Sequence, residues 1–341
     1  MKKPCFIIGA IVISFISCEP TLRYHTGTFP DTPVNMGAIN TEFDDYNSDI
    51  PVLGGTFPLC FSSNRNSDGG NYDIVYKLID VWMSKKTGDL AVEENTSWNL
   101  DVFQRYLNLL NALNVINTQA NELGPFIMPQ GDRFKRVGSG YEAFQNFVVL
   151  YASDQGGNLD IRMTDNLTDD RYSSPVDVAF LNSDFDDAYP TVNRDSSRIY
   201  FCSNRGGGDF DIWYTDLGTD GILFDALNSG DDHQVNAEAV LSSVYDDKCP
   251  YIHGNLMVFT SDRPGGFGGF DLWYSVFDGS DWSFPVNFGE KINSEYDEYR
   301  PIVKEFPYDF TNDFMIFSSN RPGGAGGFDL YYVGIEKVTV E

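Results

Sequence analysis

The sequence has few histidines and none of the short motifs of the common catalytic and metal-binding classes. Its three histidines, His25, His233 and His253, fall outside every repeated segment. It has no G-x-S-x-G elbow, no H-E-x-x-H pair, no Cys/His cluster with zinc spacing and no Lys-Ser/Thr pair after its Gly-rich segments. These absences argue against many enzyme classes but not against glycoside hydrolysis, which requires only two carboxylates from among the 50 acidic residues present.

Basic residues and cysteines are also scarce. The chain has 23 lysines and arginines against 50 acids, a net charge of −27, so it lacks the basic surface that nucleic acid binding requires. Apart from Cys5 and Cys18, the cysteines are Cys60, Cys202 and Cys249, an odd number that permits one disulfide at most. We expect Cys60 and Cys202 to be small buried residues of strands.

Long apolar runs are confined to the N-terminus. Residues 5–16 are apolar and follow Lys2 and Lys3, which predicts a secretory signal peptide over residues 1–17 and not a spanning helix. The segment FISC, which ends at Cys18, resembles a bacterial lipobox, whose cysteine is acylated. The alternative is simple secretion with Cys18 as an ordinary thiol. Residues 18–32 contain two prolines and no periodicity, and they are predicted to form a tether.

What the sequence has in abundance is one repeated hairpin. Residues 316–332 read IFSSNRPGGAGGFDLYY, two apolar alternations around a connector of asparagine and glycine that favours a tight turn. Related segments begin at residues 60, 150, 200 and 258. Five copies of one hairpin predict a repeat architecture.

A second motif precedes each hairpin and defines the full repeat. It reads INTEFDD at residues 39–45, and its other copies occupy residues 116–125, 181–190, 241–250 and 292–301. Pro-Val steps at residues 33, 175 and 285 precede three copies, and Gln234-Val235 is a looser fourth. Four short strands in a unit of roughly 50 to 75 residues suit the blade of a β-propeller.

The predicted fold class is therefore all-β, a five-bladed β-propeller of four-stranded antiparallel blades over residues 33–341. Residues 80–136 are the least regular part, and residues 98–114 have a helical period, so we expect a short helical or loop insertion in the second repeat. The insertion either packs on the propeller rim or docks a partner. Residues 33–39 are predicted to complete the last blade and close the ring, because that blade has only three strands of its own.

The S-N-R-x-G-G-x-G-x-x-D hairpin after an acidic pair resembles the WD-like β-propeller repeat of the TolB type, as in outer-membrane lipoproteins and OmpA-family proteins of the Bacteroidetes. The resemblance implies the fold more than the function, because propellers carry many unrelated activities. With Glu19 after the cysteine in place of an aspartate, it implies an outer-membrane address. Because Glu19 is the single acid in that segment, the periplasmic face is favoured over the cell surface.

Two sets of polar residues recur in the hairpin turns. Aspartates follow the turn at Asp73, Asp160, Asp211, Asp271 and Asp329, and arginines lie within it at Arg65, Arg205, Arg263 and Arg321. We expect each aspartate to accept N–H bonds from its turn and each arginine to pair with an acid of the neighbouring blade. Both sets are assigned a structural role, since catalysis would need only one or two copies.

A further set of acids precedes the innermost strand and would ring one mouth of the channel. The candidate binding residues are Asp45, Glu122, Asp187, Asp247 and Glu298, and the residues before them are Asp44, Asn121, Asp186, Asp246 and Asp297. A narrow ring of carboxylates would hold Ca²⁺ at Asp44, Asp186, Asp246 and Asp297, or attract a cationic ligand. The alternative is that each acid caps its own loop or pairs with an adjacent blade.

These observations predict a lipid-anchored, non-enzymatic binding platform at the outer membrane, with no cofactor other than the Ca²⁺ considered above. Its partner would be an envelope protein or a glycan or peptide ligand. The alternatives are a propeller glycoside hydrolase or lyase acting on polysaccharide, and a subunit of an export or uptake complex. An enzyme would have one blade whose channel-facing loop departs from the repeat with convergent acids. A platform would show a broad face of tyrosine, tryptophan and phenylalanine.

Overall fold

The computed structural model describes residues 24–96, 100–168, 171–217, 223–306 and 310–338. The expected signal peptide, Cys18 and the first part of the expected tether lie outside these ranges. Within them, no helix is both long enough and apolar enough to cross a membrane.

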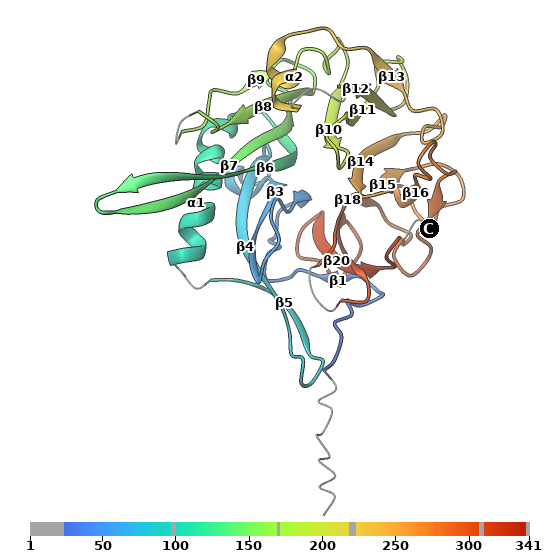
Figure 1. The fold of residues 1–341 in the computed structure, drawn as a ribbon. Coiled ribbons are helices and arrows are strands. Elements are labelled where there is room, and N and C mark those ends of the chain that lie inside the picture. The colour runs from blue at the N-terminus through green and yellow to red at the C-terminus, as the bar shows by residue number, and fades with distance from the viewer. Residues whose placement is uncertain (1–23, 97–99, 169–170, 218–222, 307–309, 339–341) are drawn as a thin grey trace, which may run out of the picture.

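Five four-stranded antiparallel sheets surround a central axis (Figure 1), which confirms the predicted five-bladed β-propeller. Blade 1 contains β2 (Asp45–Asp49), β3 (Thr56–Ser63), β4 (Asp73–Met83) and β5 (Leu90–Glu94). Blade 2 contains β6 (Glu122–Val137), β7 (Gly140–Ser153), β8 (Asp160–Asp165) and β9 (Val176–Asp177). Blade 3 contains β10 (Asp187–Val192), β11 (Arg198–Ser203), β12 (Asp211–Asp216) and β13 (Val235–Ala237).

The last two blades follow the same order. Blade 4 contains β14 (Asp247–His253), β15 (Leu256–Ser261), β16 (Asp271–Val276) and β17 (Val286–Asn287). Blade 5 contains β18 (Glu298–Lys304), β19 (Asp313–Ser319), β20 (Asp329–Ile335) and, from the other end of the sequence, β1 (Val34–Asn35). The first strands of the five repeats, β2, β6, β10, β14 and β18, contact one another around the axis. They are the innermost strands, as predicted.

The ring closes as predicted from the position of the first Pro-Val step. In blade 5, β1 pairs antiparallel with β20, Val34 opposite Tyr332 and Asn35 opposite Tyr331. The side chain of Asn40 then exchanges two hydrogen bonds of 2.9 Å with the backbone of Leu330. Residues 27–30, which belong to the expected tether, also lie against blade 5, where Phe29 is fully buried.

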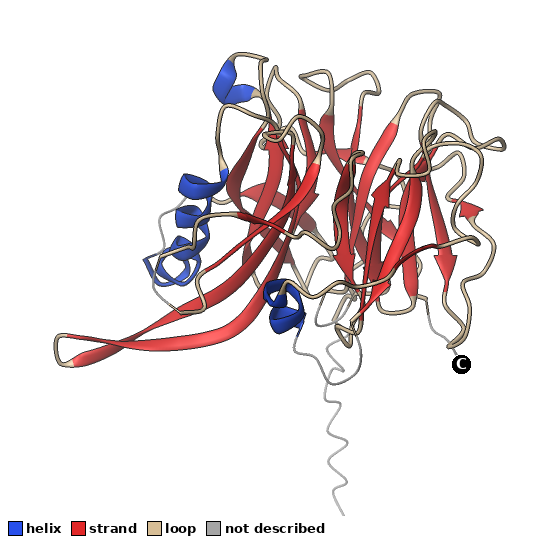
Figure 2. Cartoon of the chain, turned by 90° about the horizontal axis from the view of Figure 1, so that it is seen from above, coloured by secondary structure: helices blue, strands red, loops and turns tan. Residues whose placement is uncertain are grey.

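The insertion of the second repeat is a helix with two extended hairpins. Helix α1 (Leu100–Ile116) covers the outside of β7, and the β6–β7 hairpin projects from the ring beside it (Figures 1 and 2). The last turns of α1 bury Leu109, Ala112 and Ile116 against Phe147 and Val149 of β7. The helix is the predicted one, and its described side chains pack on the rim. A second helix, α2 (Leu223–Ser229), precedes β13.

Each innermost strand bends at its third residue. The positions are Asn47, Gly124, Tyr189, Cys249 and Arg300, and all five have φ between 48° and 59°. The pairing with the second strand shifts register at these bends, as at a β-bulge. The five residues occupy equivalent positions in the innermost strands, and we call them the axial layer.

The core lies between adjacent blades and contains the remaining cysteines. The largest apolar cluster joins blades 1, 4 and 5, with Phe57 and Phe61 on one side and Phe314 and Phe317 on the other. Cys60, Cys202 and Cys249 are all buried and unpaired, which confirms the expectation for Cys60 and Cys202.

Candidate functional site

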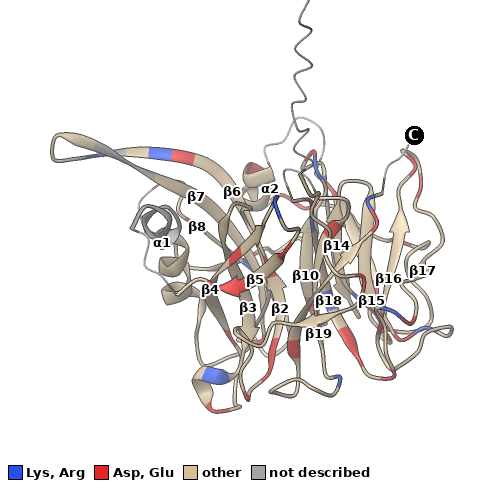
Figure 3. Ribbon diagram, turned by 90° about the horizontal axis from the view of Figure 1, so that it is seen from below, with Lys and Arg blue, Asp and Glu red and all other residues tan. Residues whose placement is uncertain are grey.

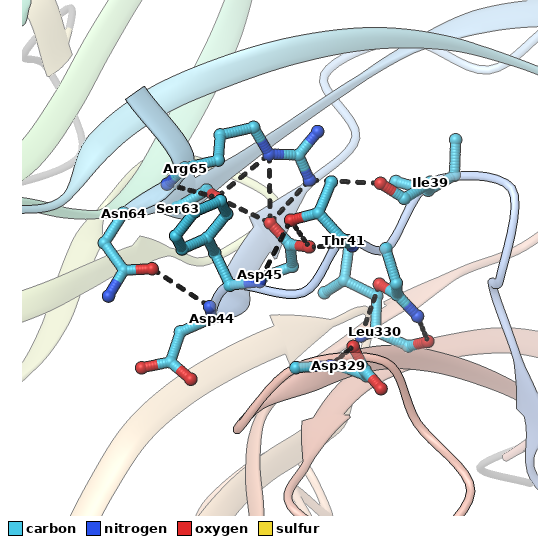
Figure 4. A network of polar contacts seen from close by, with 12 residues as sticks. Ile39, Thr41, Asp44, Asp45, Ser63, Asn64, Arg65, Asp329 and Leu330 are labelled. Atoms are coloured by element: carbon cyan, nitrogen blue, oxygen red, sulfur yellow. Dashed lines mark hydrogen bonds and ion pairs between the residues drawn. The ribbon is translucent and has the colours of Figure 1, made fainter. Parts of the chain in front are cut away.

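The acids that begin the innermost strands are internal to their blades. Asp45, Glu122, Asp187, Asp247 and Glu298 are all fully buried. In blade 1, Arg65 reaches Asp45 at 2.5 Å and also donates to the carbonyl oxygen of Ile39 at 3.0 Å (Figure 4). The equivalent pairs are Arg205–Asp187 at 2.5 Å, Arg263–Asp247 at 2.5 Å and Arg321–Glu298 at 2.7 Å.

These ion pairs correct one prediction about the arginines. Each arginine pairs with the acid of its own blade and not of the neighbouring blade, because the turn that carries it lies directly beside the start of its own innermost strand. Blade 2 has Gln155 in the arginine position, so Glu122 accepts from Thr118 and Ser153 instead. Burial raises the pKa of the Glu122 carboxyl, as it does for Asp247 and Glu298.

The first acid of each pair joins two blades. The Asp44 carboxylate accepts from the backbone N–H of Phe328 in blade 5 at 2.9 Å, while Asp45 N–H donates to the Phe328 carbonyl at 2.7 Å. The same double contact joins Asn121 to Tyr72, Asp186 to Leu159, Asp246 to Phe210 and Asp297 to Phe270. Backbone N–H groups and arginines therefore offset the negative charges of the repeated acids. Among the described residues, no group of three or more His, Cys, Asp or Glu side chains is arranged to hold a metal ion.

The turn aspartates bind their own turns in blades 4 and 5. Asp271 accepts the N–H groups of Phe267 at 2.6 Å and Gly268 at 3.1 Å, and Asp329 accepts those of Ala325 and Gly326. Asp73 instead accepts from the Asn66 amide at 3.0 Å. Burial raises the pKa of Asp160 and raises that of Asp211 to about 6.

We expect the Asp271→Ala substitution to lower the free energy of unfolding by roughly 1 to 3 kcal/mol, because three donors, Phe267 N–H, Gly268 N–H and the Asn287 amide, lose their acceptor. Thermal unfolding measures the loss. The matched control is Asp232→Ala at an exposed acid, which should leave the melting temperature unchanged. An Asp271→Ala protein as stable as the wild type would contradict the structural role.

The axial layer lines the centre of the channel. The guanidinium of Arg300 lies 5.3 Å from the ring centre of Tyr189 and donates to the Pro125 carbonyl of blade 2 at 3.2 Å. The Asn47 amide donates to the Tyr189 hydroxyl at 3.4 Å. Gly124 leaves room for the Tyr189 ring, which a Cβ at that position would overlap. Residues of blades 1, 2, 3 and 5 therefore meet at the axis.

The mouth at the carboxyl ends of the innermost strands departs from the repeat, and we call it the carboxyl-end mouth. Asp49 is an acid where the other blades have Phe126, Thr191, Tyr251 and Ile302. It is 1% exposed, accepts the Ile127 N–H at 2.8 Å and lies 3.6 Å from the Lys304 ammonium. Burial lowers the pKa of Lys304, but Tyr251 and Asp49 outweigh it, so the net shift is upward.

Two more acids at this mouth have no acidic counterpart in the other blades. Lys337 lies 3.2 Å from a carboxylate oxygen of Glu305 and 3.9 Å from one of Asp313, so these two oxygens are no farther apart than the sum of those distances. Asp313 is buried while Glu305 is exposed, and burial raises the pKa of Asp313. The His253 imidazole lies 3.9 Å from Asp313, and its pKa is lowered by burial and by Lys304.

Open space borders this mouth on both sides of the β14–β15 turn. A pocket of about 660 Å³ includes Arg198, Tyr200, Ile252 and Trp282, and one of about 450 Å³ includes Leu256 and Lys337. Charges around the ring are mainly acidic (Figure 3). On the opposite face, beside the hairpin turns, Phe185, Tyr245 and Tyr296 are exposed next to the blade-joining acids.

Asp49, Glu305, Asp313 and Arg300 were not among the site residues predicted from the sequence. An internal alignment of the five innermost strands carries the signal, because Asp49 and Arg300 are charged at positions where the other four blades have uncharged residues. Their burial and partners depend on the other blades and were not visible in the repeat pattern.

The fold and site define a five-bladed β-propeller with interacting side chains of several blades at its axis and an acid-bearing mouth. No family model and no curated protein sequence matches this protein. Among solved structures, a complex of BT0996 with RGII is similar over 94% of this protein and 94% of that one, at 8% identity and a TM-score of 0.54. A structure named "Glycoside hydrolase" matches 92% of this protein and 94% of its own length, at 9% identity and a TM-score of 0.51.

A third similar structure is the catalytic domain of the GH62 α-L-arabinofuranosidase of Coprinopsis cinerea, at 11% identity and a TM-score of 0.45 over 92% of this protein and 97% of that one. At these identities the likeness shows the fold alone. The match named "Glycoside hydrolase" nevertheless overturns the prediction of a non-enzymatic protein, which is wrong. That prediction relied on the absence of catalytic motifs, and a glycoside hydrolase with the same propeller fold is among the matching structures.

Proposed function

We propose that the protein is a glycoside hydrolase that acts on a polysaccharide at the carboxyl-end mouth. The observation that carries the proposal is the group of three acids, Asp49, Glu305 and Asp313, each of which stands alone at its position in the repeat. Repetition assigns the acids of the hairpin turns and of the acidic pairs to the scaffold, whereas these three lie at the carboxyl-end mouth. The structure named "Glycoside hydrolase" supports the proposal through its common fold.

The environments of Glu305 and Asp313 suit the two roles that glycoside hydrolysis needs. The raised pKa of buried Asp313 suits the general acid, which must carry a proton to the leaving oxygen. Exposed Glu305 is the carboxylate that activates water or attacks the sugar. The Lys337 distances are compatible with the separations of about 5 to 9.5 Å found between the paired carboxyls of glycosidases.

Asp49 and the neighbouring pockets complete the proposed site. Asp49 holds Lys304 beside His253 and so shapes the charge at the mouth. The 660 Å³ pocket offers aromatic side chains, Tyr200 and Trp282, beside the Arg198 guanidinium. A pocket lined in this way combines apolar contact with a few polar groups, as ligand sites commonly do. A polysaccharide bound there would reach the acids from the blade 3 and blade 4 side.

The cellular setting is part of the proposal. The lipobox-like segment before Cys18 supports export and acylation, with the propeller tethered at the outer membrane. The resemblance to TolB-type lipoproteins supports the outer-membrane address, and the single acid Glu19 after Cys18 favours the periplasmic face. An envelope protein as partner is in keeping with that setting. The negative surface favours neutral over acidic glycans, because like charges repel.

Release of reducing ends from a panel of neutral polysaccharides by the mature protein tests the proposal. Glu305→Gln and Asp313→Asn should each lower the rate by about 100- to 10,000-fold, because each removes a proton-transfer or nucleophilic group. Asp232→Asn, at an exposed acid of blade 3, is the matched control and should keep full activity. Melting temperatures establish that the variants are folded.

The proposal fails if the wild-type protein releases nothing from any polysaccharide of the panel. It also fails if both carboxamide variants remain folded and fully active. An unsaturated product, detected by its ultraviolet absorbance, would identify a lyase instead.

A further inference from the structure

The centre of the channel contains a buried cation without a buried anion. Arg300 is fully buried, and its side chain is among the largest in the protein with no exposed surface. Its Nη2 donates to the Pro125 carbonyl at 3.2 Å, while Nε and Nη1 have no hydrogen-bond partner. A guanidinium carries five N–H donors and stays protonated in proteins. Arg300 therefore has unmet donors and an unmet charge.

The neighbours of Arg300 in the axial layer are neutral. They are the Tyr189 ring at 5.3 Å, the Asn47 amide bound to Tyr189, and the Cys249 thiol, which is buried and unpaired. The pKa of the Cys249 thiol is raised by burial, so it does not supply a negative charge. Within the described ranges, no ion pair joins Arg300 to a carboxylate.

Two other cations of the innermost strands, Lys248 in β14 and Lys304 in β18, each have an acid. Lys248 lies 2.9 Å from Asp246, and Lys304 lies 3.6 Å from Asp49. The turn arginines likewise pair with the first acids of the innermost strands. Arg300 differs from all of these. Because removing an unpaired charge from water is costly, a buried cation of this kind calls for a compensating anion.

We propose that the channel centre holds a small monovalent anion, with chloride as the physiological ion, bound to the unpartnered N–H groups of Arg300. The enclosed position excludes a polymeric ligand, and a single negative charge balances a single guanidinium. The anion would fix the axial layer, because Arg300 contacts blades 2 and 3 from blade 5. This site is separate from the carboxyl-end mouth and does not depend on hydrolytic activity.

Bromide tests the site, since it replaces chloride and can be located by anomalous scattering. Crystals of the wild-type protein grown with bromide should show an anomalous peak within hydrogen-bond distance of Arg300 Nε or Nη1. In solution, the melting temperature of halide-free protein should rise by several degrees as bromide replaces gluconate at constant ionic strength, and the rise should saturate as mass action requires.

Arg300→Met should abolish the bromide-dependent rise, because it removes both the charge and the donors while keeping an apolar side chain of similar length. Arg194→Met, at an exposed arginine beside the same channel, is the matched control and should respond as the wild type does. If Arg300→Met does not fold, the wild-type crystal still decides the question. The proposal is overturned if the crystal shows water and no bromide at Arg300, or if Arg300→Met retains the wild-type response to bromide.

Discussion

Replacing Gly326 with alanine is expected to destabilise the propeller by about 3 kcal/mol, the upper end of the usual cost of overpacking. A Cβ on Gly326 would overlap the backbone of Phe43 and approach the Thr41 carbonyl oxygen. These are backbone atoms at the junction of blades 5 and 1, so a side-chain rotation cannot relieve the overlap. The melting temperature should fall by about 6 to 12 °C, measured by calorimetry or circular dichroism.

Gly208→Ala provides the matched control for Gly326→Ala. Gly208 also lies in a hairpin turn, but a Cβ there would meet no atom within 4 Å. Its replacement should change the melting temperature by a degree or so at most. Equal losses at the two positions would show that the turn backbone, and not the contact between blades, sets the requirement for glycine.

The second large effect is expected at Phe29, which fastens the N-terminal segment to blade 5. Its ring is fully buried, with centroids 4.5 Å from Phe310, 4.7 Å from Phe314 and 5.3 Å from Phe306. Phe29→Ala should cost about 3 to 5 kcal/mol, because it removes a large apolar side chain and leaves a cavity. Chemical denaturation with the linear extrapolation measures the loss.

Phe284→Ala tests whether the loss at Phe29 reflects burial. Phe284 is 84% exposed, so removing its ring should leave stability nearly unchanged. Limited proteolysis of Phe29→Ala should also cut the segment before β1 sooner than in the wild type, because that segment loses its anchor. A Phe29→Ala protein as stable as Phe284→Ala would contradict the role of residues 24–35 in closing the ring.

Several elements could be predicted because their signals are local. The connectors of asparagine and glycine between alternating residues predicted the hairpins, and the 3.6-residue period of residues 98–114 predicted α1. The Pro-Val step at Val34 predicted closure, since the last blade needed one more strand. Blade 1 shows the limit of this reasoning. Its outer strand β5 (Leu90–Glu94) has no Pro-Val step, and the sequence offered no register for it.

The acid pairs show where the prediction of the site stopped. The sequence showed five acidic pairs. It left open whether each acid caps its own loop or pairs with an adjacent blade. Only the structure shows that Asp45 forms an ion pair with Arg65 of its own blade and that Asp44 accepts a hydrogen bond from the Phe328 N–H of blade 5. Residues 44 and 328 are adjacent in space only because the ring closes. Lys337, by contrast, meets Glu305 and Asp313 within blade 5, because the pairing of β19 with β20 places Ile335 opposite Asp313.

The sequence by itself determined the number of blades, the turns that shape them and the strand that closes the ring, because repetition and backbone preference act over a few residues. The tertiary structure alone decided which polar residues belong to the scaffold and which remain for chemistry. Asp45 and Asp49 lie four residues apart in one strand, yet one is paired with an arginine of its own blade and the other faces Lys304 of blade 5. Burial, pairing and unmet charge depend on the atoms that the other blades bring to the axis.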